Sequence, residues 1–332
     1  MPEVYLTIFF ISVLLIFLGS GVWVGISMIG VSTIGMMMFT SRPVGDAMAT
    51  TMWSMGSSWS LTALPLFVWM GEILFRTKLS ENLFKGLSPW LSKLPGGLIH
   101  INILGCAIFA AISGSSAATV ATVGKMSIPE LRKRNYPESF LLGTLAGSGT
   151  LGLLIPPSII LIIYGVTVEE SIAKLFIAGI IPGIGLALLF MIYVVGWSLR
   201  NKKIMPIISE DFSFMEKIKQ SGQLIPVVLL IFAVIGSIYA GIATATEAAS
   251  LGVLGALILS YFQKSLTKES FSKSLLGATK TSCMIAFILA GSSFLTLAMA
   301  FTGLPKNLSL IHISEPTRRY AISYGGFCLE KK

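Results

Sequence analysis

A stretch with the composition of a ligand site lies inside the apolar segment that covers residues 138–168. Residues 147–158 read GSGTLGLLIPPS, and the two adjacent prolines remove two backbone donors and clash with the preceding helical turn. We therefore expect a broken helix, which exposes carbonyls that coordinate Na⁺ and amides that attract an anion. The candidate binding residues are Gly147, Ser148, Gly149, Thr150, Pro156, Pro157 and Ser158.

A second break is predicted upstream, in the apolar stretch 97–124. Basic residues flank this stretch on both sides, so it should enter and leave the membrane on the same face. Its centre, SGSSAAT at 113–119, is small and polar, which favours the tip of a re-entrant helical hairpin. Irregular backbone survives at membrane depth only where protein packs around it or where it lines a wet cavity. The tip candidates are Ser113, Gly114, Ser115, Ser116 and Thr119.

The two predicted breaks contain no Arg, Lys or His. A substrate carboxylate would therefore be met by backbone amides, hydroxyls and bound Na⁺ rather than by a fixed cation. For any single Gly or Ser, the simpler interpretation is close packing between helices. Two such breaks in neighbouring membrane segments favour a binding site, because interrupted segments mark the sites of transporters.

A weaker candidate is the TATE sequence at 244–247, which comprises Thr244, Thr246 and Glu247. The alternative, which we prefer, is an ordinary helix start in which Thr246 caps the helix and Glu247 complements its dipole. Glu72 and His100 lie near the ends of apolar segments, and we interpret both as interface or structural residues rather than proton carriers.

The composition indicates a membrane protein, because 54% of the 332 residues are apolar and only 12% are charged, against about one quarter in soluble domains. The net charge of +9 lies in short segments between apolar runs, so it signals orientation rather than nucleic-acid binding. We expect cytoplasmic loops at 76–93, 125–134, 200–219 and 264–280, with an amphipathic segment at 79–94. The predicted crossings are 4–20, 22–39, 53–75, 140–168, 175–199, 222–240, 248–263 and 281–302.

The loop charges also predict an internal repeat. A first unit at 1–199 makes five net crossings, so a second copy must run inverted, which is a transporter signature. We place a cytoplasmic linker at 200–221 and the start of the second repeat at 222–308. A channel or membrane scaffold is the rival class, and it requires a continuous pore or a partner-facing surface. A membrane enzyme is disfavoured because no cluster of His, Cys, Asp or Glu converges at one depth.

Several motifs follow one another along the chain: AISGSSAAT at 111–119, IPEL at 128–131, KRNY at 133–136, GTLG at 149–152, IPPS at 155–158, SIAKLFIAG at 171–179 and PG at 182–183. Together with PLF at 65–67 and LPGG at 94–97, they resemble the large permease subunit of tripartite ATP-independent periplasmic (TRAP) transporters. The likeness covers about residues 1–308. Two departures are Asn135, where the family usually has Gly, and Ala245, where it often has Pro.

The resemblance implies an all-α, elevator-type transporter of the ion transporter superfamily, with two inverted repeats that each carry a hairpin. In such a protein, residues 113–116 match the first hairpin tip, and 147–150 with 156–158 match the broken helix. The implied function is sodium-coupled import of organic acids, such as C4-dicarboxylates or sialic acid, across the bacterial inner membrane. The implied partners are a small four-helix membrane subunit and a periplasmic solute-binding protein, with Na⁺ as coupling ion and no other cofactor.

An ion-coupled anion transporter of the same superfamily that works without a binding protein is the alternative function. Residues 309–332 turn polar and lose any membrane period, and they resemble translated non-genomic sequence. A genuine short soluble tail is the milder interpretation. We therefore expect a C-terminally truncated chain whose second repeat stops before its own hairpin.

Overall fold

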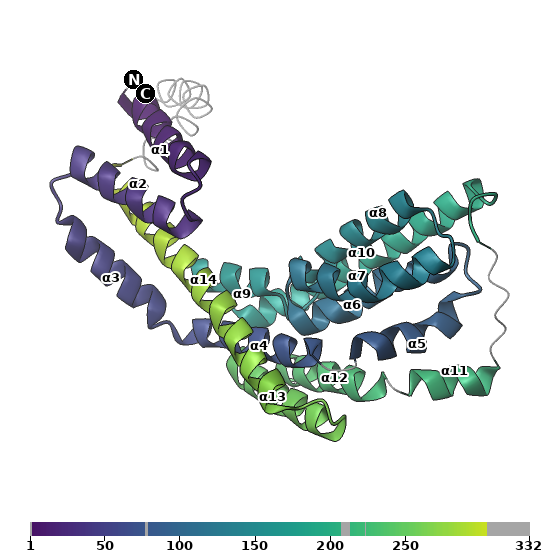
Figure 1. The fold of residues 1–332 in the computed structure, drawn as a ribbon. Helices are drawn as coiled ribbons and strands as arrows, with labels where there is room; N and C mark the ends of the chain where they lie inside the picture. The colour runs from purple at the N-terminus through teal and green to yellow at the C-terminus, as the bar shows by residue number, and fades with distance from the viewer. Residues whose placement is uncertain (1, 77–78, 207–212, 223, 304–332) are drawn as a thin grey trace, which may run out of the picture. The chain divides into compact units, whose positions relative to one another are not determined.

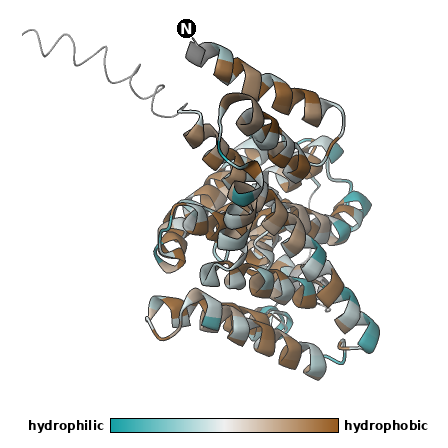
Figure 2. Cartoon of the chain, turned by 90° about the vertical axis from the view of Figure 1, so that its left-hand side faces the viewer, coloured by the Kyte–Doolittle hydropathy of each residue, from teal (hydrophilic) through white to brown (hydrophobic). Residues whose placement is uncertain are grey.

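The computed structural model describes residues 2–76, 79–206, 213–222 and 224–303. All the regular elements within these ranges are helices, which confirms the predicted all-α class (Figure 1). Figure 2 shows hydrophobic residues along most of the helices. By length and composition, three described helices could cross a membrane, or up to five if each of two bent helix pairs counts as one span.

The chain forms two compact units, Met1–Ser58 with Cys283–Lys332, and Trp59–Ser282. The described helices of the first unit are α1 (Pro2–Gly19), α2 (Val24–Phe39), α3 (Val44–Gly56) and the second half of α14 (Lys268–Phe301). Within this unit α2 and α14 touch through their backbones, because a Cβ at Gly291 would lie 2.9 Å from the Gly25 carbonyl oxygen. These two units are defined by contacts and do not test the predicted inverted repeats, which remain a prediction.

The larger unit holds both predicted breaks. Its helices are α4 (Ala63–Phe75), α5 (Leu79–Leu91), α6 (His100–Ser113), α7 (Ser116–Lys133), α8 (Glu138–Gly149), α9 (Ile159–Thr167), α10 (Ile172–Arg200), α11 (Phe214–Ser221), α12 (Ile225–Tyr239), α13 (Ala245–Phe262) and the first half of α14. Short 3-10 turns add η1 (Trp59–Thr62), η2 (Gly97–Ile99) and η3 (Thr150–Leu153).

Helix α6 lies at the centre of this unit. It packs against α4, α5, α7, α8 and α10, and ten of its fourteen residues are buried. Its buried polar side chain, Asn102, donates from Nδ2 to the Leu141 carbonyl oxygen of α8 at 3.2 Å. The Leu98 N–H, just before α6, donates to the hydroxyl of Tyr136, just before α8, at 3.0 Å. Burial raises the pKa of Tyr136 to about 12. These bonds hold α6 and α8 in register, so the two breaks at their ends lie together.

The predicted crossing at 53–75 is built from two helices rather than one, and the crossing itself stays a prediction. Helix α3 ends at Gly56, and α4 begins only at Ala63, after the 3-10 turn η1. Ser57 and Ser58 follow Gly56. All three propagate a helix poorly, because glycine costs backbone entropy and serine bonds to nearby backbone.

Two of the predicted basic loops are largely helical. Helix α7 continues past residue 124 to Lys133, and α14 begins at Lys268 rather than at residue 281. Lys, Arg and Glu are good helix formers, so their charge does not end a helix. Each basic segment also contains an ion pair between residues about one helical turn apart. The pairs are Lys133 with Glu130 and Lys273 with Glu269. The predicted hairpin is therefore longer on its second arm than 97–124.

The predicted amphipathic segment at 79–94 contains the helix α5, which packs against α11. Trp90 donates from Nε1 to the Ser221 hydroxyl at 2.8 Å, and Lys217 lies 5.5 Å from the centre of the Trp90 ring. The position of this helix pair at a membrane surface stays a prediction.

The structure corrects the capping residue that was predicted for α13. The N-cap is Thr244 rather than Thr246: its hydroxyl accepts from the Glu247 N–H at 3.3 Å, and Glu247 accepts from the Thr244 N–H at 2.8 Å. This reciprocal pattern requires a spacing of three residues between the Thr and the Glu. That spacing selects Thr244, which lies three residues before Glu247.

Replacing Thr244 by Ala should lower the unfolding free energy by about 0.5–2 kcal/mol, because the first turn of α13 loses its cap. The matched variant Thr246→Ala should change it little, because the Thr246 side chain does not cap α13. Tryptophan fluorescence during SDS titration of the purified protein measures both. Equal losses in the two variants would show that the cap is not at Thr244.

Candidate functional site

The first predicted break separates α6 from α7. Helix α6 ends at Ser113, and Gly114 follows with φ +59°, a left-handed conformation that glycine adopts without strain. Ser115 is extended and caps α7, because its hydroxyl accepts from the Ala118 N–H at 3.4 Å. The hydroxyls of Ser113 and Thr119 lie 2.9 Å apart. The carbonyl end of one helix therefore faces the amide end of the next.

The second predicted break separates α8 from α9. After Gly149 the chain tightens into the 3-10 turn η3, passes through Pro156 and Pro157, and resumes as a helix at Ile159. The Ser158 hydroxyl donates to the Leu153 carbonyl oxygen at 2.7 Å, across the break. Neither proline can donate a backbone hydrogen bond, so the helix cannot run through them.

The two breaks are in direct contact. The Ile159 N–H, at the start of α9, donates to the Gly114 carbonyl oxygen with an N–O distance of 3.2 Å. A Cβ at Gly114 would lie 2.7 Å from the Pro157 carbonyl oxygen, and one at Gly152 would lie 2.9 Å from the Ser116 nitrogen. Glycine at these two positions is thus what allows the backbones to meet. The amide ends of α7 and α9 and the carbonyl end of α6 converge at one point.

A cavity of about 190 Å³ lies beside this point. Ser113, Ser115 and Ile159 line it from the two breaks, and Glu72 of α4 and Thr281 of α14 line it from the other side. Helix α4 comes this close because Gly71 has no side chain: a Cβ there would lie 2.9 Å from the Ser113 Cα. Hydroxyl, carbonyl and carboxylate oxygens are the ligands that a hard cation prefers.

Some predicted site residues are engaged within their own segments. The Ser148 hydroxyl is buried and donates to the Thr144 carbonyl oxygen at 2.7 Å, and Thr150 donates to the Gly147 carbonyl oxygen at 2.7 Å. The Ser116 hydroxyl oxygen, in contrast, is buried and has no hydrogen-bond partner among the described residues.

Of the predicted site residues, all of which the structure describes, Ser113 and Ser115 alone line the cavity at the breaks. Gly147 lines a separate cavity of about 470 Å³ between α8 and α10. Thr244, Thr246 and Glu247 form the first turn of α13 and line neither cavity.

The contribution of α4 and α14 to the cavity was not predicted from the sequence. Glu72 was interpreted as an interface or structural residue, and Thr281 was not among the candidates. A signal was available, because Glu72 is the only acidic residue between Asp46 and Glu81. A lone carboxylate within a membrane segment is a functional candidate by default, since its burial in hydrocarbon is costly.

Comparison with known proteins assigns the family. A model described as "Tripartite ATP-independent periplasmic transporter, DctM component" matches residues 11–321. The chain belongs to this TRAP transporter family. The family is one of transporter components rather than enzymes. The match extends into the tail at 309–332, which lies outside the described residues.

Curated relatives agree with this assignment. The C4-dicarboxylate TRAP transporter large permease protein DctM of Pseudomonas aeruginosa is 32% identical over 79% of this chain and 61% of its own length. The isethionate TRAP transporter permease protein DctMQ of Oleidesulfovibrio alaskensis is 32% identical over 85% of this chain and 44% of its own length. The sialic acid TRAP transporter large permease protein SiaM of Vibrio cholerae is 31% identical over 87% of this chain and 67% of its own length.

The contact between the breaks predicts the effect of a small side chain. Gly114→Ala should lower the unfolding free energy by at least about 1–2 kcal/mol, because alanine is strained in the left-handed conformation and its Cβ would meet the Pro157 carbonyl oxygen. SDS-driven unfolding followed by tryptophan fluorescence measures the loss.

Gly143→Ala is the matched control, because a Cβ at this helical position meets nothing within 4 Å. It should leave the unfolding free energy unchanged or raise it by up to about 1 kcal/mol through better helix propensity. A Gly114→Ala protein as stable as the Gly143→Ala protein would contradict the observed contact.

Proposed function

We propose that the chain is part of the large transmembrane subunit of a sodium-coupled secondary transporter, which spans the lipid bilayer of a bacterial inner membrane several times. Its proposed substrates are organic acids, such as C4-dicarboxylates, sialic acid or similar carboxylates. The observation that carries this proposal is the hydrogen bond between Ile159 and Gly114, which brings two helix breaks to one cavity.

The proposed chemistry follows from the ends of the helices. The carbonyl end of α6 carries partial negative charge and suits Na⁺, while the amide ends of α7 and α9 carry partial positive charge and suit a carboxylate. The hydroxyls of Ser113 and Ser115 line the cavity between them. A bound Na⁺ would reduce the cost of bringing an anion into this apolar surrounding, so binding of the ion and binding of the substrate would be coupled.

The proposal includes partners. The family description names a tripartite system, which supports a small four-helix membrane subunit and a periplasmic solute-binding protein beside this subunit. The large apolar residues exposed along α10, among them Ile181, Leu189 and Ile192, suit contact with lipid or with such a membrane partner. An elevator mechanism with inverted repeats at 1–199 and 222–308 belongs to the same proposal.

Transport by the complete gene product tests the function. Reconstituted in proteoliposomes with the small subunit and the binding protein, it should take up a labelled organic acid when an inward Na⁺ gradient is applied. The Ser115→Ala variant should need about five- to tenfold more Na⁺ for half-maximal uptake, the equivalent of one lost hydrogen-bonding ligand.

Thr167→Ala is the matched control, because Thr167 is exposed on α9 and bonds only to the Ile163 carbonyl oxygen of its own helix. It should leave the Na⁺ requirement unchanged. Uptake that proceeds equally with K⁺ would contradict sodium coupling, and uptake without the binding protein would favour the simpler ion-coupled transporter.

A further inference from the structure

Glu72 is the one carboxylate that lines the cavity at the breaks, among the residues that the structure describes there. It follows Gly71, the residue at which α4 touches the hairpin tip. Its side chain is 26% exposed, so it is not sealed inside the protein. A charged group in such a place has a partner or a function as a rule, and Arg76 is one partner of Glu72.

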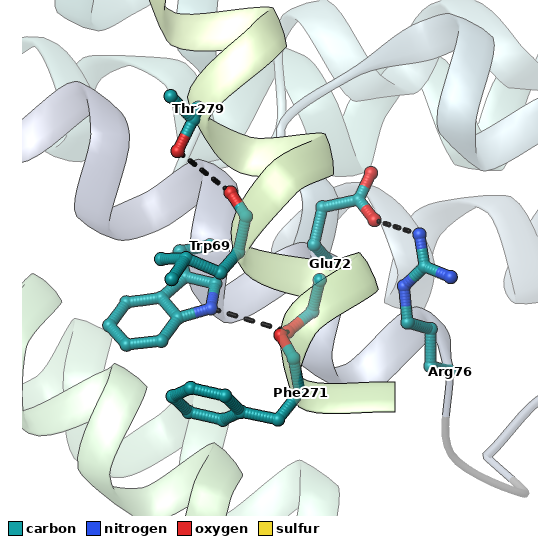
Figure 3. Close-up of polar contacts among 7 residues, drawn as sticks. Trp69, Glu72, Arg76, Phe271 and Thr279 are labelled. Atoms are coloured by element: carbon teal, nitrogen blue, oxygen red, sulfur yellow. Dashed lines mark hydrogen bonds and ion pairs between the residues drawn. The ribbon is translucent and has the colours of Figure 1, made fainter. Parts of the chain in front are cut away.

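The position of the Glu72 side chain is set by the packing of α4 against α14 (Figure 3). Trp69 donates from Nε1 to the Ser274 hydroxyl at 3.3 Å, and its ring meets Phe271 edge to face at 5.8 Å. One turn further along α14, Gly277 leaves room for the carboxylate: a Cβ there would lie 2.9 Å from the Glu72 Oε2. The carboxylate therefore lies against α14 at Gly277, beside the cavity.

One oxygen of this carboxylate is available to a ligand. Oε2 accepts from Arg76 at 3.0 Å, one helical turn later, as Figure 3 shows. No hydrogen bond to Oε1 is found among the described residues. The cavity thus presents a free carboxylate oxygen together with the hydroxyls of Ser113, Ser115 and Thr281. Its volume of about 190 Å³ also exceeds the roughly 10–15 Å³ that one water needs, so an ion could keep part of its water shell.

We propose that Glu72 is a direct ligand of the coupling cation, and that Thr281 and the hydroxyls of the hairpin tip complete its site. This inference rests on the proposed function and adds to it a charged ligand from outside both breaks. The charge balance connects the ion to the substrate: Glu72 and Arg76 together are neutral, so a bound Na⁺ gives the group a net charge of +1. One carboxylate group of an organic anion, placed at the neighbouring amide ends of α7 and α9, would cancel that charge.

Sodium binding by the purified complete gene product tests this inference without transport. The thermal unfolding midpoint is recorded while NaCl replaces choline chloride at constant ionic strength, and the Na⁺ concentration for half the stabilisation is compared between variants. Glu72→Gln should raise that concentration about tenfold or more, because the bond to a charged ligand is lost. Glu72→Asp, which keeps the charge, should raise it less.

Two variants separate a ligand from a structural ion pair. Arg76→Gln removes the partner of Glu72 and should leave Na⁺ binding unchanged or tighter, because the carboxylate loses a competing cation. Glu130→Gln removes a carboxylate of α7 that pairs with Lys133 outside the cavity, and it should have no effect. If Arg76→Gln weakened Na⁺ binding as much as Glu72→Gln does, the role of Glu72 would be structural and the inference would be wrong.

The outcomes also separate this inference from the proposed function. If Ser115→Ala weakens Na⁺ binding while Glu72→Gln leaves it within about twofold, the ligand assignment fails and the sodium site at the breaks stands. If the unmutated protein shows no response to Na⁺, both fail. Should Glu72→Gln not fold, Glu72→Asp and Gly277→Ala, which crowds the carboxylate, carry the test: Na⁺ binding unchanged in both would overturn the inference.

Discussion

The rest of the site depends on one backbone hydrogen bond, from the Ile159 N–H to the Gly114 carbonyl oxygen. A broken helix leaves amides and carbonyls without partners, and in an apolar surrounding each unpaired group costs several kcal/mol. Two breaks placed against each other offset part of that cost, because the end of one helix pairs with the start of another. The cavity at this contact is lined by Ser113 and Ser115 of the hairpin tip, whose hydroxyls we propose meet the ion.

This constraint explains why small residues concentrate where they do. Gly114 and Gly152 allow the two breaks to meet, and Gly71 allows α4 to reach the hairpin tip. In each case a single Cβ would lie within about 3 Å of backbone on the neighbouring segment. The glycines are thus a requirement of backbone contact, and the proposed ligand-binding chemistry would use groups that this contact leaves free. The packing interpretation and the binding interpretation of these residues are complementary.

Local chemistry could be predicted from the sequence, and distant contacts could not. Pro156 and Pro157 cannot continue a helix, so a break at that place followed from two residues alone. Tertiary packing brings Gly114 to Pro157 and Glu72 to the same cavity. A single glycine or glutamate in a sequence does not indicate which distant residue it will contact. The lysines and arginines at 125–134 and 268–280 led to a prediction of loops. The structure has helices there, because both residue types are good helix formers.

The most direct test of a shared sodium site is amide hydrogen exchange in the complete gene product, compared between Na⁺ and choline. If the two breaks bind one ion, exchange should slow in Na⁺ in peptides covering both 111–119 and 155–162, since ligand binding stabilises both segments against local opening. Exchange in α13 should not change, because α13 lines no part of the cavity. Protection confined to one break, or identical exchange in the two salts, would contradict a site shared by the hairpin tip and the broken helix.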